Sequence, residues 1–241
     1  MNKRMTPKIS IATVTWARTV EEKIIVLKTL KKLASFGLPV IVVDQANSKF
    51  PLIDEAKKIK GICVFKASKH GLDFQVRKSF EEAAKLGDYI FFTESDKLDF
   101  VKNHAERFLG EFYKHPHGTW LPARSRISFL RFPKFQQDME RFLWEAVSAL
   151  LNIKRNDFTY GPRIFPAVLL PHFNKVREEI NCGFQAFLLA INHKLKLPLH
   201  IMEFNSGAPV DIQMGDELIA YRIQQLEDEL RGLRIGWNMK V

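Results

Sequence analysis

The sequence predicts an α/β fold in which helices flank a mostly parallel β-sheet. In the first hundred residues, short apolar runs rich in β-branched residues alternate with segments whose apolar residues recur at helical spacing. Such repeats of strand, helix and strand join parallel strands through right-handed crossovers. The chain has 241 residues, of which 46% are apolar and 27% charged, so it can bury a substantial core. We expect one domain over residues 1–241, with halves at 1–100 and 101–241.

Four buried strands are expected in the first half, because four apolar runs there are only four to seven residues long. They lie at residues 9–15, 40–43, 62–65 and 89–93. Two helices are predicted between them, at residues 20–34 and 72–83, where apolar residues share one helix face. The crossover at 47–60 has a weaker helical pattern.

The second half has a looser pattern with more helices. Amphipathic spacing predicts helices at residues 101–112, 139–150 and 219–233, and the almost uninterrupted apolar run 182–191 predicts a buried helix. Strands are expected at 119–123 and 199–204. Residues 160–170 contain Pro162 and Pro166, so we expect an edge strand or an extended segment there. The sequence has no internal repeat and no low-complexity linker.

The positions of glycine exclude two common nucleotide-binding classes. The first glycine is Gly37, so the loop 16–19 after the first strand contains none, and Gly-x-Gly occurs nowhere. The dinucleotide fingerprint and the P-loop both need glycine at this first turn, because backbone amides must approach the phosphates there. A dehydrogenase or a P-loop kinase is therefore disfavoured, and so is a nucleotidylyltransferase with a glycine-rich first loop.

Charged side chains follow the ends of the predicted strands, where ligands bind in open α/β sheets. The second strand ends in Asp44, the fourth runs into Glu94-Ser95-Asp96, and the helix between the third and fourth carries Arg77. Two carboxylates two residues apart can face one hard cation, which would bridge a diphosphate. Asp44 would hydrogen-bond a base or ribose, and Arg77 would pair with phosphate.

These segments resemble a known enzyme family. The runs VIVVDQANS and GLDFQVRKSFEEAAKLGDYIFFTESD, within residues 9–100, look like the amino-terminal half of a family 2 type nucleotide-sugar glycosyltransferase of the GT-A fold. In that family an Asp at the end of the second strand reads the nucleobase, and a later strand delivers an Asp-x-Asp metal motif. Glu94 stands where that motif has its first Asp. The resemblance implies a nucleotide-sugar-binding half at 1–100 and an acceptor-binding half at 101–241 with a closing helix.

The resemblance also implies roles for individual residues. Mn²⁺ or Mg²⁺ would be held by Asp96 and Glu94, with His200 as an additional ligand. The nucleotide-sugar would contact Asp44, Arg77, Ser95 and Thr15. In inverting members an acid ahead of an apolar helix deprotonates the acceptor hydroxyl, and the residues at that place are Glu179, which we favour, and Glu178.

Each of these residues also has a structural interpretation. Asp44 could form a turn after its strand, and Ser95 or Asp96 could cap the following helix. Arg77 could pair with Glu81 one turn later. The two glutamates could simply be favourable acids at a helix start, and His200 could be an ordinary hydrogen-bonded histidine.

The middle of the chain holds most of the excess positive charge. The whole chain has 37 Lys and Arg against 27 Asp and Glu, and residues 113–175 hold ten against four, a net charge of +6. Basic residues alternate with Phe129, Phe132 and Phe135 over residues 124–135. This pattern suits an anionic or lipid-linked acceptor, peripheral membrane contact, or single-stranded nucleic acid. The alternative is a loop whose aromatic side chains pack inward.

The two cysteines, Cys63 and Cys182, are too few for a disulfide framework, and the amino terminus lacks the apolar stretch of a secretory signal. We therefore expect a cytoplasmic protein.

Together these observations predict a metal-dependent glycosyltransferase that moves a sugar from a nucleotide diphosphate-sugar to a hydroxyl acceptor. The alternatives are a nucleic-acid-binding protein that uses the basic middle, a nucleotidylyltransferase on the same fold, and a sugar-nucleotide-binding protein without turnover. No stable nucleic acid partner is expected.

Overall fold

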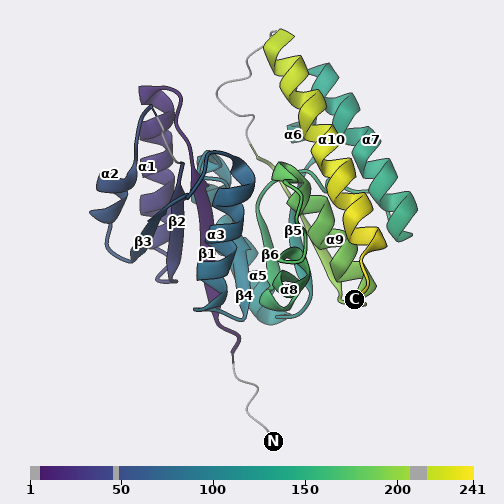
Figure 1. The fold of residues 1–241 in the computed structure, drawn as a ribbon, viewed down its shortest axis with the longest axis horizontal. Helices are drawn as coiled ribbons and strands as arrows, with labels where there is room; N and C mark the ends of the chain where they lie inside the picture. The colour runs from purple at the N-terminus through teal and green to yellow at the C-terminus, as the bar shows by residue number, and fades with distance from the viewer. Residues whose placement is uncertain (1–5, 46–48, 207–215) are drawn as a thin grey trace, which may run out of the picture. The chain divides into compact units, whose positions relative to one another are not determined.

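A computed structural model describes residues 6–45, 49–206 and 216–241. The chain divides into two compact units (Figure 1). Unit 1 comprises residues 1–118 and 162–170, and unit 2 comprises residues 119–161 and 171–241. The division of one domain at residue 100 stays a prediction.

Unit 1 contributes five strands to the sheet, in the order β3-β2-β1-β4-β6. The strands β1 (Ile9–Thr15), β2 (Val40–Asp44), β3 (Ile62–Lys66) and β4 (Tyr89–Phe92) are parallel. The register pairs Thr15 directly with Asp44. Strand β6 (Arg163–Pro166) runs antiparallel to β4, with Arg163 opposite Phe92. The carboxyl ends of β1, β2 and β4 thus lie along one edge of this sheet.

Two helices of unit 1, α1 and α3, begin at residues that favour a helix start. In α1 (Val20–Ala34) the Thr19 hydroxyl accepts a hydrogen bond from the Glu22 amide, and Glu21 and Glu22 lie in the first turn. Gly71, at φ 125°, precedes α3 (Leu72–Ala84) in a conformation that favours glycine. The other helices of this unit are α2 (Ile53–Lys57), α4 (Leu98–Asn103) and α5 (Ala105–Lys114), and the 3-10 turn η1 spans Ala167–Leu169.

Unit 2 combines one parallel strand pair with long helices. Strand β5 (Thr119–Arg124) pairs with β7 (Leu199–Phe204). The main helices are α7 (Lys134–Leu151), α9 (Phe184–Lys194) and α10 (Asp216–Asn238), of which α10 packs against both others (Figure 1). The short segments are α6 (Arg126–Phe129), α8 (Leu170–Phe173), which spans the unit boundary, and the 3-10 turn η2 (Asn181–Gly183).

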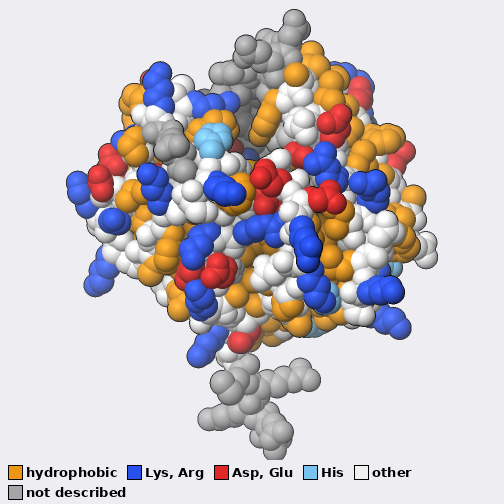
Figure 2. Space-filling model, viewed as in Figure 1, with side chains coloured by type: hydrophobic (Ala, Val, Ile, Leu, Met, Phe, Trp, Pro, Cys, Tyr) orange, Lys and Arg blue, Asp and Glu red, His pale blue; other side chains and the backbone are white. Residues whose placement is uncertain are grey.

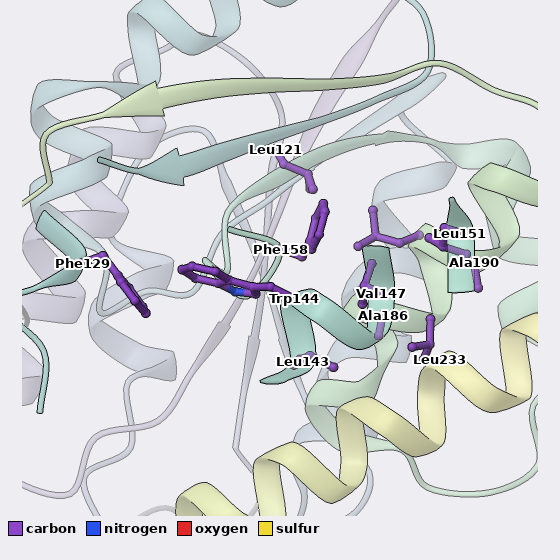
Figure 3. Close-up of a cluster of buried hydrophobic side chains, with 11 residues drawn as sticks. Leu121, Phe129, Leu143, Trp144, Val147, Leu151, Phe158, Ala186, Ala190 and Leu233 are labelled. Carbon is purple, nitrogen blue, oxygen red and sulfur yellow. The ribbon is translucent and has the colours of Figure 1, made fainter. Parts of the chain in front are cut away.

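The core of unit 2 lies between α7, α9, α10 and β5. Figure 3 shows its apolar side chains, among them Leu121, Trp144, Val147, Ala190 and Leu233, all at most 8% exposed. The amphipathic faces that the sequence indicates for these helices therefore bury one another.

The predicted fold class is confirmed, and each predicted strand and helix has a counterpart. Residues 160–170 form a short strand that includes Pro166 and then turn into η1. Helix 101–112 is divided into α4 and α5 at His104. Within the described ranges, the structure contains no helix with the length and apolar character needed to cross a bilayer.

Candidate donor and metal site

Thr15 and Asp44 meet at the carboxyl ends of β1 and β2. Asp44 is only 1% exposed. Its Oδ1 accepts a hydrogen bond from the Thr15 hydroxyl at 2.7 Å, and its Oδ2 accepts one from the Leu52 amide at 3.0 Å. One carboxylate oxygen therefore binds the end of β1, and the other binds the backbone of Leu52, eight positions further along the chain. Contact between Asp44 and a nucleoside stays a prediction.

Gln75 on α3 is a polar residue of this edge that the sequence analysis did not identify. Its Nε2 donates to the Thr15 carbonyl at 2.8 Å and to the Val43 carbonyl at 2.9 Å. The side chain is buried and joins the ends of β1 and β2. A glutamine within a helical pattern gives no signal of such a role, because its partners lie 32 and 60 positions away.

Ser95 holds the turn after β4 against β1. Its hydroxyl donates to the Val14 carbonyl at 2.8 Å, and the side chain is buried. Helix α4 begins later, at Leu98, and no side chain caps it. The interpretation of Ser95 or Asp96 as a helix cap is therefore wrong, because the turn between β4 and α4 is longer than a cap requires.

Glu94 and Asp96 occupy different environments although two positions separate them. Oε2 of Glu94 is buried, whereas the Asp96 side chain is 61% exposed. Burial raises the pKa of Glu94, and the negative charge of Asp96 adds to the increase, while Lys97 and Arg163 oppose it. The two carboxylates thus lie within electrostatic reach of each other, and proximity to a cation would relieve their repulsion.

Arg163 is a second residue that the sequence analysis did not place in this site. It begins β6, is 1% exposed, and acts electrostatically on Glu94. In the sequence it counts only as one of the basic residues of the middle segment. The structure buries it in unit 1, so it does not contribute to a basic surface.

The Asp96 carboxylate forms an ion pair with Lys97 Nζ at 2.8 Å on the surface. Surface pairs of this kind contribute about 0–1 kcal/mol, so a divalent cation can replace the ammonium at little cost. Mg²⁺ and similar ions bind through one or two carboxylates together with substrate phosphates, and the binding of such an ion by Glu94 and Asp96 stays a prediction. Across the described parts of the chain, no three His, Cys, Asp or Glu side chains form a ready cluster of ligands.

Arg77 pairs with a different partner from the one its spacing suggests. Its Nε donates to Asp73 at 2.5 Å, one turn earlier in α3, and Asp73 is buried. Glu81, the partner named from the sequence, pairs with Lys78 and Lys85 instead. The Arg77 side chain is 23% exposed, and its contact with a diphosphate stays a prediction.

The remaining candidates belong to unit 2. Glu178 and Glu179 are exposed and precede η2, which leads into α9. Their position ahead of the buried helix is as expected, and the role of Glu179 as a base stays a prediction. His200 on β7 stacks on Trp120, with ring centroids 4.4 Å apart and an interplanar angle of 20°. Its role as a metal ligand is likewise untested.

Two of the three aromatic side chains of the basic segment 124–135 pack inward. Arg124 is buried, and Phe129 and Phe132 are 4% and 7% exposed with their rings 5.1 and 4.7 Å from the Arg124 guanidinium carbon. These rings cannot stack on the bases of a nucleic acid, so the inward-packed alternative holds for them. Phe135, at 37% exposed, remains accessible.

The accessible charge does not form a single basic stripe on the face that Figure 2 shows. Lys and Arg side chains are spread over it, with Asp, Glu and hydrophobic side chains between them. A continuous basic track is what a nucleic acid backbone requires, so this face does not favour nucleic acid binding.

Comparison with solved structures decides the fold class. Several structures of glucosyl-3-phosphoglycerate synthase from Mycobacterium tuberculosis match 95% of this chain and 80% of their own. The structure with Mn²⁺, UDP and glucosyl-3-phosphoglycerate has a TM-score of 0.67, and that with Mn²⁺, UDP-glucose and phosphoglyceric acid has 0.68, both at 16% identity. The chain has a GT-A-like fold. No protein-family model matches the sequence, and no curated protein matches it.

Proposed function

We propose that the protein is a metal-dependent glycosyltransferase that moves a sugar from a nucleotide diphosphate-sugar to a hydroxyl acceptor. The observation that carries this proposal is the acidic turn after β4, in which Ser95 is bonded to β1 while the Asp96 carboxylate reaches the surface. This turn lies at the sheet edge where open α/β folds bind ligands. The GT-A-like fold supports the same function, because the similar synthase binds UDP-glucose and Mn²⁺.

The nucleoside would bind near the ends of β1 and β2. Trp16 directly follows Thr15 and is 53% exposed, so its indole offers a face on which a base can stack. Asp44, Thr15 and Gln75 form a network of buried hydrogen bonds beside it. This network fixes the backbone at the strand ends, so the site would need little reorganisation when the donor binds.

In the reaction, the bond between the sugar C1 and the diphosphate oxygen breaks while C1 bonds to the acceptor oxygen. A cation held by Asp96 and Glu94 would neutralise the charge on the departing nucleoside diphosphate. The acceptor hydroxyl gives its proton to a base, and we assign this role to Glu179 for an inverting reaction. Replacing a general base lowers the rate by about 10²–10⁴-fold. Glu179→Gln should therefore lose far more activity than Glu178→Gln, the matched variant at the neighbouring exposed position.

The acceptor is proposed to be anionic. The similar synthase has been solved with phosphoglyceric acid and with glycerol 3-phosphate. The chain carries a net charge of +10, which favours partners that bear phosphate. Phosphorylated small hydroxy compounds are therefore the first acceptors to test with UDP-glucose.

Thermal unfolding with nucleotide-sugars tests the proposal. UDP-, GDP-, CMP- and dTDP-linked sugars are added with and without Mn²⁺ to the wild type, to Asp96→Asn and to Asp54→Asn. Asp54 is an exposed carboxylate on α2 and is the matched control. A ligand at about 100 times its Kd stabilises the native state by about 2.7 kcal/mol, which for this length raises Tm by about 5–10 °C.

We expect one nucleotide family to stabilise the wild type and Asp54→Asn in the presence of Mn²⁺, and not Asp96→Asn. Absence of stabilisation by every sugar nucleotide, or equal stabilisation of Asp96→Asn, refutes the proposal. Release of nucleoside diphosphate with an acceptor then distinguishes an active transferase from a protein that binds the donor without turnover.

A further inference from the structure

The segment 126–134, which we call the α6–α7 turn, exposes two aliphatic side chains. Ile127 is 69% exposed, the largest exposed fraction among the large hydrophobic side chains that the structure describes, and Leu130 is 50% exposed. The two are three positions apart, so they project from the same side of one helical turn. Exposed apolar side chains that adjoin one another and are rimmed by polar residues are a feature of protein and membrane interaction sites.

The inward side of the same turn is held by buried contacts. Ser125 caps α6 through the Ser128 amide, and Phe129 and Phe132 pack over Arg124. Gln137 Nε2 donates to the carbonyls of Leu130 and Phe132, at 3.3 and 2.7 Å. The turn therefore cannot bury Ile127 and Leu130 by rotating without breaking this packing.

Basic side chains flank the two aliphatic ones along the chain. Arg126 and Arg131 are exposed within the turn, Lys134 has a side chain 72% exposed, and Arg141 lies two turns further along α7. Asp138 is the carboxylate that pairs with Lys134 and Arg141. Four cations against one exposed carboxylate leave a local charge of +3.

We propose that the α6–α7 turn docks on an anionic membrane surface, with Ile127 and Leu130 entering the interface and Arg126 and Arg131 contacting lipid phosphates. Aliphatic tips bordered by basic side chains have the composition of interfacial membrane-binding segments. A single-stranded nucleic acid would instead stack its bases on exposed aromatic rings, and the two aromatic residues of this turn, Phe129 and Phe132, are buried. This inference does not depend on the proposed glycosyl transfer, since it concerns only where the protein resides.

Cosedimentation of the full chain with phospholipid vesicles tests the proposal. The probes are vesicles of phosphatidylcholine alone and vesicles with 30% phosphatidylserine. Each basic residue near such a surface contributes about 1 kcal/mol, so Arg126→Gln with Arg131→Gln should reduce partitioning into the anionic vesicles about 30-fold. Ile127→Ser with Leu130→Ser should reduce partitioning into the anionic vesicles at least tenfold. Raising the salt concentration should weaken the binding of the wild type to these vesicles.

Matched controls lie on unit 1. Lys57→Gln with Lys60→Gln removes two exposed charges, and Leu86→Ser removes a 42% exposed leucine. Both controls should bind vesicles as the wild type does, and circular dichroism should show that every variant is folded. The proposal is overturned by absence of vesicle binding, by equal loss in the controls, or by undiminished binding of both turn variants. Binding of a single-stranded oligonucleotide through Arg126 and Arg131, without vesicle binding, would also overturn it.

Discussion

Replacing Arg124 should destabilise the protein more than any other single change in the basic segment. Its Nε and Nη2 bind the two oxygens of Asp157 at 2.6 and 3.0 Å, and Nη2 also bonds Glu140 and the Thr159 hydroxyl. The side chains of Arg124, Asp157 and Glu140 are 3%, 2% and 14% exposed. Removal of the guanidinium therefore leaves two carboxylates in the interior without their cation.

The expected cost follows from this burial. Breaking a buried ion pair by removing one partner costs about 3–5 kcal/mol, because the remaining charge stays desolvated. For a protein of this length each kcal/mol lowers Tm by about 2–4 °C, so Arg124→Met should lower Tm by about 6–20 °C. Arg126→Met is the matched control: Arg126 is exposed two positions away, and its loss should change stability by less than about 0.5 kcal/mol.

The pH dependence gives a second, independent readout. Burial by itself would raise the pKa of Asp157, but Arg124 reverses this and lowers the pKa below its ordinary value of 3.8. In the wild type, the ion pair between Arg124 and Asp157 stabilises the folded state fully above pH 3.8. This stabilisation is lost as the pH falls through the lowered pKa of Asp157. In Arg124→Met, burial without the cation should raise the pKa of Asp157, so protonation at pH 5 should relieve part of the defect that is present at pH 7.

Urea unfolding at pH 7 and pH 5, followed by circular dichroism, measures both effects. We expect the difference in the free energy of unfolding between the wild type and Arg124→Met to be smaller at pH 5 than at pH 7. A loss below about 1 kcal/mol at pH 7, or an equal loss at the two pH values, would show that the carboxylates are hydrated after the substitution and that the reasoning is wrong.

Three further changes have defined outcomes. Gln75→Leu should cost about 1–3 kcal/mol in urea unfolding, because two buried carbonyls lose a donor; an unchanged midpoint would contradict this. In Gly183→Ala the new Cβ would lie 2.0 Å from a backbone oxygen of α10, so the melting temperature should fall sharply. Gly110 lies within α5 with open space at the position of an added Cβ, so Gly110→Ala should raise the melting temperature slightly. Lys97→Gln should increase the affinity for Mn²⁺ up to about fivefold in a titration, since a competing surface ion pair is removed; weaker binding would count against Asp96 as a ligand.

Much of the fold could be predicted because its causes are local. Apolar runs of four to seven residues identify β1 to β4, helical spacing identifies α1, α3, α7 and α10, and a longer apolar run identifies the buried helix α9. The positions of Asp44 at the end of β2 and of Asp96 after β4 could be predicted as well, whereas their roles in a site stay predictions. Both inferences need only the pattern of side chains along a short stretch of chain.

Which partner each polar side chain binds could not be predicted, because the partners come from distant segments. Arg124, Glu140, Asp157 and Thr159 form one network over 35 positions of sequence, and nothing in their spacing indicates it. Arg163 likewise looks like one more basic residue until β6 pairs with β4. Burial removes both arginines from the basic surface that composition suggests, and for this reason charge counts overstate that surface.

Asp44 and Asp96 should respond differently to the same substitution, since only Asp44 makes buried hydrogen bonds that hold the fold together. Asp44 accepts from Thr15 and Leu52, so in Asp44→Asn one donor faces the new amide group, at a cost of about 1–3 kcal/mol. Asp96 is exposed and has only a surface ion pair to lose. Asp44→Asn should therefore lower both Tm and donor affinity, whereas Asp96→Asn should leave Tm unchanged and abolish the Mn²⁺-dependent part of donor binding. An equal loss of Tm in both variants would mean that the acidic turn after β4 is structural, and the metal site would then have to lie elsewhere.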